Sequence, residues 1–178
     1  MSEPSPNVVA ERFAVFSGVT DCFKCECETP VAAIVVADHH EGPEPFDDDD
    51  SDSEIEATSD PALLGNITWL NPSALQVMKD LAPWMAWIES ATAEQVYLGN
   101  GCIHCGALQG DWFLRKPEGP CFPMTNEDAD RLGVSWQQVP LRAVASCGHS
   151  TWIDALLERR GDYITPAYQR RGKRTAGV

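Results

Sequence analysis

Two short cysteine motifs, Cys22-Phe23-Lys24-Cys25 and Cys102-Ile103-His104-Cys105, carry the strongest structural signal in this chain. Each is a C-x2-C motif that closes a tight turn, and an apolar stretch typical of a strand follows within a few residues. Gly106 follows the second motif and permits a close approach of the backbone to the sulfur atoms. Backbone N–H groups in such turns point at thiolates, so two facing turns form a tetrahedral cage of four sulfurs.

The paired motifs resemble the zinc ribbon class, and the resemblance rests on Cys22, Cys25, Cys102 and Cys105 alone. It implies one structural Zn²⁺ ion held by these four cysteines. The 76 residues between the second and third cysteines exceed the roughly 15–20 of the usual spacing, so we expect an insertion there. A rubredoxin-like iron site has the same geometry. Redox pairs, two separate sites and buried free thiols are the other interpretations.

The acidity of the chain is concentrated in one segment. The 178 residues include 27 acidic and 13 basic side chains, and eleven of the acidic ones lie between Asp38 and Asp60, where there is no Lys or Arg. Mutual repulsion and the lack of apolar residues predict a disordered acidic loop at about 40–60. The loop is a solvated segment, an arm for a basic partner, or a metal-binding group of carboxylates, although it lacks the glycine spacing of a calcium loop. The net charge of −14 argues against general nucleic-acid binding.

The rest of the composition predicts one domain. We expect residues 1–168 to form a single zinc-ribbon-containing α+β domain and residues 169–178 to form a basic mobile tail. No apolar run approaches the roughly 18–20 residues of a membrane span, and the N-terminus lacks the features of a signal peptide. The seven cysteines are an odd number, which disfavours a full disulfide framework. The sequence therefore predicts a cytoplasmic protein that does not contact a membrane.

The secondary-structure signals are short. Apolar or alternating runs predict strands at 12–16, 30–36, 67–70, 111–115 and 139–145. Capping residues predict helices after Asn71, Thr125 and Ser150. The run at 84–88 fits either a strand or a helix. We therefore expect an α+β fold in which short antiparallel strands surround a zinc-ribbon-like site, with two or three short helices and an inserted acidic loop.

Other residues suggest chemistry less strongly. His39 and Glu41 have the H-x-E order of zinc deaminases, with Cys102 and Cys105 as the cysteine pair, but the prolines after Glu41 exclude the required helix. Cys147 and His149 are metal-ligand types two residues apart at an expected helix start, where the pKa of the thiol would fall. The preferred interpretation is that Gly148 makes a strand-to-helix turn between two ordinary neighbours.

Three further residues have ordinary interpretations beside the chemical ones. Asp111 is either a turn residue or a catalytic carboxylate. Cys27 is expected to be a free thiol, and Cys121 is expected to pack in the core.

Three functional hypotheses follow. The first is a non-enzymatic zinc protein that binds a protein partner with a basic surface, as an acidic inhibitor or toxin-neutralising protein would. The second is a zinc ribbon that binds nucleic acid through residues 170–174, with the acidic loop as an autoinhibitory cover. The third is a zinc-dependent or cysteine-based enzyme that uses Cys147, His149 or Asp111. The first is preferred because the sequence contains no recognisable catalytic constellation.

Overall fold

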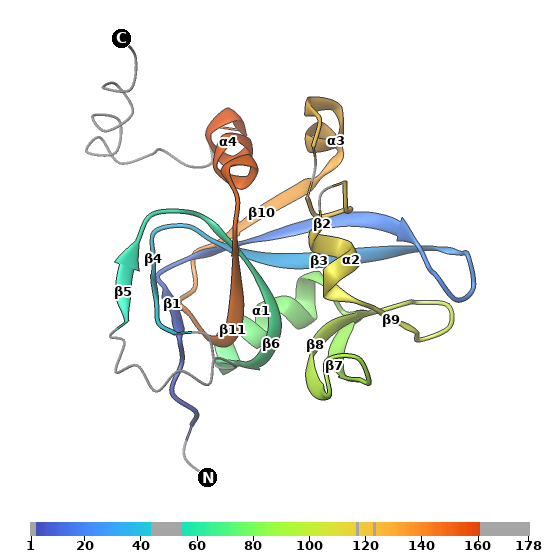
Figure 1. Cartoon of the computed structure of the whole chain (residues 1–178), viewed down its shortest axis with the longest axis horizontal. Helices are drawn as coiled ribbons and strands as arrows, with labels where there is room; N and C mark the ends of the chain where they lie inside the picture. The colour runs from blue at the N-terminus through green and yellow to red at the C-terminus, as the bar shows by residue number, and fades with distance from the viewer. Residues whose placement is uncertain (1–2, 44–54, 117, 123, 161–178) are drawn as a thin grey trace.

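One curled antiparallel sheet contains most of the strands (Figure 1). The computed structural model describes residues 3–43, 55–116, 118–122 and 124–160. Within these ranges eight strands hydrogen-bond in the order β10-β2-β3-β6-β11-β1-β4-β5. Their bounds are β1 Val8–Ala10, β2 Phe13–Asp21, β3 Glu28–Val36, β4 His39–Glu41, β5 Glu56–Thr58, β6 Ala62–Leu70, β10 Gly133–Gln137 and β11 Leu141–His149.

A small second sheet lies beside the β2–β3 hairpin. Its three strands are β7 Met85–Ser90, β8 Gln95–Gly101 and β9 Leu108–Gln109. Asn100 joins this sheet to the large one, because its side chain accepts the Ala32 N–H at 2.8 Å and donates to the Ala32 carbonyl at 2.9 Å. The turn after β8 is thereby held near the turn between β2 and β3, as Figure 1 shows.

Both faces of the large sheet are covered by apolar side chains. Because side chains alternate along a strand, Phe13 and Val15 of β2 belong to one core cluster and Phe16 belongs to the other. Helix α1 (Pro72–Leu81) packs into the first cluster through Ala74 and Met78. The second cluster receives α2 (Asp111–Arg115), α3 (Asn126–Arg131) and α4 (Thr151–Arg160).

The capping signals place three helices correctly. Pro72 begins α1 directly after Asn71, and α4 begins directly after Ser150. The Thr125 hydroxyl accepts the Asp128 N–H at 3.1 Å at the start of α3. The strand predicted at 111–115 is wrong, because these residues form α2. Its first turn contains Asp111, whose carboxylate accepts the Asn66 N–H, and its last turn contains Arg115, so both charges suit the helix dipole.

The predicted α+β fold of short antiparallel strands around a zinc-ribbon-like site is wrong. Strands make up 45% and helices 21% of the described residues, and the large sheet forms a curled half-barrel. Polar strand ends concealed the true strand lengths. For example, the last five residues of β2 alternate between exposed and half-buried. The pairing of β6 with β11 joins residues far apart in sequence, which local patterns do not reveal.

Part of the predicted acidic loop, residues 44–54, lies outside the described residues. The whole of the predicted basic tail, residues 169–178, also lies outside them. At the borders of the acidic stretch, β4 pairs with β5 through His39–Thr58 and Glu41–Glu56. The boundaries of a single domain at 1–168 stay a prediction. Among the described helices, none has the length and apolarity needed to cross a membrane.

Candidate metal centre

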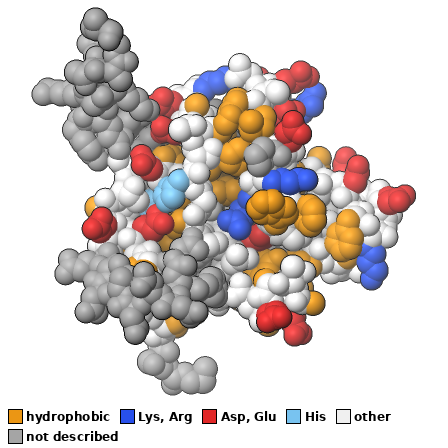
Figure 2. All heavy atoms as spheres, in the orientation of Figure 1, with side chains coloured by type: hydrophobic (Ala, Val, Ile, Leu, Met, Phe, Trp, Pro, Cys, Tyr) orange, Lys and Arg blue, Asp and Glu red, His pale blue; other side chains and the backbone are white. Residues whose placement is uncertain are grey.

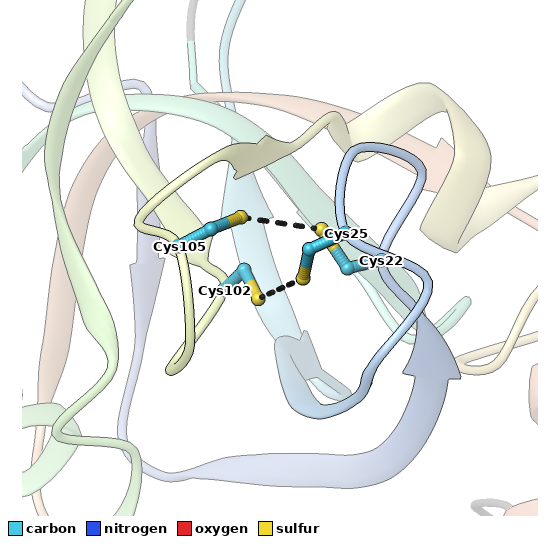
Figure 3. A group of neighbouring side chains, drawn as sticks. All are labelled: Cys22, Cys25, Cys102 and Cys105. Carbon is cyan, nitrogen blue, oxygen red and sulfur yellow. Dashed lines mark hydrogen bonds between the residues drawn. The ribbon is translucent and has the colours of Figure 1, made fainter.

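The four cysteines of the two C-x2-C motifs converge (Figure 3). Cys22 and Cys25 come from the turn between β2 and β3, and Cys102 and Cys105 come from the turn between β8 and β9. The Sγ atoms of Cys22 and Cys105 are 3.6 Å apart, those of Cys25 and Cys102 are 3.7 Å apart, and all four lie within 4.8 Å of one another. A zinc–sulfur bond of about 2.3 Å gives a tetrahedral edge of about 3.8 Å. The four sulfurs can therefore hold one metal ion between them.

The two turns have the same backbone geometry. In each, the first cysteine accepts a hydrogen bond from the N–H four residues later and donates one to the carbonyl five residues later. The four bonds are Glu26 N–H to Cys22 O (2.9 Å), Cys22 N–H to Cys27 O (3.0 Å), Gly106 N–H to Cys102 O (2.8 Å) and Cys102 N–H to Ala107 O (2.9 Å). Glu26 and Gly106 both have positive φ, 58° and 72°. The two cysteine turns are thus copies of one backbone geometry.

Backbone N–H groups approach the first sulfur of each turn. The Lys24 N–H donates to Cys22 Sγ at 3.4 Å, and the His104 N–H donates to Cys102 Sγ at 3.4 Å. In both bonds the donor is the backbone N–H of the residue two positions after the first cysteine. The side chain of His104 reaches the other cysteine hairpin, where its Nε2 lies 3.1 Å from the carbonyl of Glu28 at the start of β3.

These donors separate the pKa values of the four thiols. Burial raises the pKa of Cys22, but the N–H groups of Cys25 and Lys24, with the neighbouring thiols, lower it to about 6. For Cys25 the Cys27 N–H lowers the pKa, while burial and the three neighbouring thiols together raise it to about 12. The pKa of Cys102 is lowered, and that of Cys105 is raised. In each turn the first cysteine therefore ionises most readily.

Two buried polar side chains that the sequence did not suggest connect the turns. Thr29 and Gln109 each lie seven residues after the first cysteine of their turn. The Thr29 hydroxyl accepts the Ile103 N–H of the opposite turn at 3.2 Å, and Gln109 Nε2 donates to Cys22 Sγ at 3.4 Å. The matching offset is the only sequence signal that could have found them. Each therefore helps to hold the opposite turn in place.

The other two cysteines outside the strands take no part in this group. Cys27 is exposed, and its Sγ donates to the Cys25 carbonyl at 3.5 Å. Cys121 is fully buried in the second core cluster, as predicted. Burial, assisted by the charge of Asp111, raises the pKa of Cys121 to about 12.

The structure separates the residues of the deaminase arrangement. His39 and Glu41 lie on strand β4 and belong to a different ligand group from Cys102 and Cys105. The expectation that Cys147 and His149 sit at a helix start is wrong, because both lie on β11, where side chains two apart share a face. Cys147 joins His39 and Glu41 in a second group of possible ligand atoms. Asp111 is bonded to the Asn66 N–H at 2.8 Å at the start of α2.

An open groove of about 1280 Å³ lies next to the metal centre. Three exposed aromatic side chains line it: Phe23 is 74% exposed, Trp112 is 72% exposed and Phe113 is 62% exposed. Figure 2 shows hydrophobic side chains gathered on this face among charged ones. The charged residues that line the groove are Asp21, Glu89, Asp111, Glu118, Lys24 and Lys116. Phe23 belongs to the first cysteine turn, so the groove and the centre share an element.

Comparison of the sequence with protein-family models and with curated proteins, and of the fold with solved structures, gives no match. Function is therefore inferred from the geometry described above.

Proposed function

We propose that the protein is a non-enzymatic zinc-binding protein whose metal centre fixes a surface for a protein partner. The observation that carries the proposal is the tetrahedral spacing of Cys22, Cys25, Cys102 and Cys105. Four cysteine ligands fill the coordination sphere of Zn²⁺ and leave no position for a substrate, which is the pattern of structural zinc sites. No disulfide joins any of the seven cysteines, all of which lie among the described residues, and this fits a reducing compartment such as the cytoplasm.

The groove beside the centre supports a protein partner. Exposed aromatic residues at one site are typical of interaction surfaces, because their burial supplies binding energy. Phe23, Trp112 and Phe113 stay exposed here although each carries a large apolar side chain. The end of the β2–β3 hairpin, residues 21–28, contains three exposed acidic residues, Asp21, Glu26 and Glu28, and one basic residue, Lys24. The proposed partner therefore presents an apolar segment flanked by Lys or Arg, as a basic target of an acidic inhibitor would.

Metal analysis of the purified chain tests the first part of the proposal. We expect colourless protein that contains zinc, and Cys102→Ser should lose the zinc of this centre while Cys27→Ser keeps it. The matched control is suitable because Cys27 is exposed and lies outside the four-sulfur group. A visible absorption band from iron would correct the metal. Disulfides that join the two turns, found by mass spectrometry without reduction, would refute the metal centre.

A displayed library of random peptides tests the second part. We expect the wild-type protein to enrich peptides with aromatic or aliphatic residues next to Lys or Arg. The doubly substituted variant Trp112→Ser/Phe113→Ser should no longer bind them. Trp87→Ser serves as the control, because Trp87 is also exposed but does not line the groove. Enrichment of acidic peptides, or equal binding by the double variant, would contradict the proposal.

A further inference from the structure

A second group of ligand atoms lies on the large sheet. His39 and Glu41 share one face of β4, and Cys147 and His149 share one face of β11, because each pair is two residues apart on a strand. Side chains from both strands meet at the carboxylate of Glu41. Its Oε2 lies 3.2 Å from His39 Nε2 and 2.8 Å from His149 Nε2. One ligand atom each from His39, Glu41 and Cys147 all lie within 4.8 Å of one another.

The sheet topology explains why these residues meet. Strand β1 lies between β11 and β4, but it has only three residues and pairs with β11 from Leu141 to Ala143. The side chain of Asn7 ends this ladder by bonding both the N–H and the carbonyl of Ala145. Cys147 and His149 lie beyond that point, where β11 still pairs with β6. The curl of the sheet then brings the end of β11 toward β4.

A buried ring nitrogen of His39 is an independent observation that points to a ligand at this group. The side chain of His39 is fully buried, and Nδ1 has no hydrogen-bond partner among the described residues. Such an atom costs about 1–3 kcal/mol if it stays unpaired. Since Nε2 faces the Glu41 carboxylate at 3.2 Å, Nδ1 is the ring nitrogen that remains to bind a ligand.

We propose that His39, Glu41 and Cys147 bind a second divalent metal ion of the zinc type, and that His149 orients the Glu41 carboxylate by a hydrogen bond. A mixed nitrogen, oxygen and sulfur donor set suits Zn²⁺ and disfavours Ca²⁺ and Mg²⁺, which prefer oxygen alone. One imidazole, one carboxylate and one thiolate neutralise the ion, whereas four thiolates leave a net −2 charge. Three protein ligands also leave a fourth position for an exchangeable water, unlike the closed four-cysteine centre.

Titration of the metal-free full chain with Co²⁺ tests this site. We expect the wild-type protein to bind two equivalents, the weaker one with the absorption of a single thiolate ligand. Cys147→Ser and His39→Gln should each lower the affinity of the weaker site by on the order of 100-fold. His149→Gln should lower it by about 10-fold, as is usual for partners that orient a metal ligand. His40→Gln and Cys27→Ser are the controls, because both residues are exposed and lie outside the group.

The four-cysteine centre serves as an internal control in the same experiment. Its own cobalt–thiolate absorption shows whether each variant is folded, so the loss of the second site can be told from misfolding. If His39→Gln misfolds, Cys147→Ser and the wild-type stoichiometry decide the question. Binding of one equivalent by the wild-type chain, or of two with unchanged affinity by Cys147→Ser, would overturn the second site. Neither result bears on the first centre, which Cys102→Ser tests separately.

Discussion

At the residue scale, the two cysteine turns differ at one position, where the backbone conformation is unfavourable for every residue except glycine. Glu26 and Gly106 occupy the same place in their turns and have φ values of 58° and 72°. This left-handed conformation costs a residue with a Cβ atom roughly 1–2 kcal/mol and costs glycine nothing. The first turn carries that strain, and the second avoids it.

Gly106→Ala should therefore lower the free energy of unfolding by about 1 kcal/mol, whereas Glu26→Ala should change it little. No heavy atom lies within 4 Å of a Cβ built on Gly106, so the cost comes from the backbone alone. Urea denaturation of the zinc-loaded variants measures both values. Equal losses for the two variants would contradict the explanation by left-handed backbone strain.

The buried thiol of Cys121 gives a prediction about alkaline stability. Its pKa is raised from 9.0 to about 12 by burial and by the charge of Asp111. Between these values the folded protein holds a proton that the unfolded chain has lost. The stabilisation is therefore complete below about pH 9 and is lost as the pH rises toward 12.

Raising the pH from about 8 to about 10.5 should cost the wild-type protein about 2 kcal/mol more than it costs Cys121→Ala. The measurement is urea denaturation of both proteins at both pH values, with zinc held constant. Other groups titrate equally in the two proteins, so their contributions cancel. A pH dependence identical in the two proteins would mean that Cys121 is not kept protonated by the fold.

At the scale of elements, asparagine side chains repeatedly take the place of a neighbouring strand. Asn7 bonds both backbone groups of Ala145, and Asn100 bonds both backbone groups of Ala32. Asn71 similarly accepts the Arg142 N–H at 2.9 Å and donates to the Pro140 carbonyl at 3.1 Å. An amide group offers the same donor and acceptor as a peptide unit. These residues thus satisfy strand edges where a ladder ends.

Asn100→Ala should lower both stability and zinc affinity. It leaves the buried Ala32 backbone and the Trp84 Nε1 donor, 3.1 Å from Asn100 Oδ1, without their partner. We expect a loss of at least about 1–3 kcal/mol in unfolding free energy. The zinc affinity should fall by about 10-fold or more in competition with a chelator, because Asn100 lies two residues before Cys102.

Asn7→Ala is the matched control for this prediction, because Asn7 makes the same paired bonds on strand β11 and contacts neither cysteine turn. It should reduce stability and leave the zinc affinity of the four-cysteine centre unchanged. A similar loss of zinc affinity in both variants would show that the effect comes from general destabilisation.

Local signals predicted individual elements well. The proline after Asn71, the cap at Thr125 and the β-branched run at 30–36 each reflect short-range physics, and the structure contains α1, α3 and β3 there. The aromatic residues of 111–115 misled the strand prediction, because Trp112 and Phe113 are exposed on a helix rather than buried in a sheet.

The candidate sites depended on both local and long-range information. The spacing within each C-x2-C motif revealed the four-cysteine group, since each turn is local. The roles of Thr29 and Gln109 arise only when the turns face each other. The meeting of Glu41 with His149 joins residues 108 positions apart through a sheet whose strand order no local pattern specifies.

At the scale of the whole molecule, most of the core does not depend on the metal. The two large apolar clusters cover both faces of the eight-stranded sheet, and only Leu98 represents the small sheet among their buried residues. Zinc is therefore expected to organise the cysteine turns and the small sheet rather than the entire fold.

Removal of zinc by a chelator should leave the far-ultraviolet circular dichroism largely intact and lower the melting temperature by on the order of 10 °C. Hydrogen exchange should accelerate in β8, in β9 and at the ends of β2 and β3 next to the turns. The amides of β6 and β11 should stay protected, because β11 and β6 pair at the centre of the large sheet. Global unfolding when the metal is removed would show that the large sheet also depends on the metal.

The 76 residues between Cys25 and Cys102 also have a consequence for synthesis on the ribosome. At 5–20 residues per second, the second turn emerges roughly 4–16 s after the first. During that interval the nascent chain exposes two thiols that cannot yet complete a tetrahedral centre, and they are open to oxidation or to capture by a softer metal. Under the proposed function, loading of the metal centre is therefore a late event, and a filled centre marks a chain whose two cysteine turns have docked.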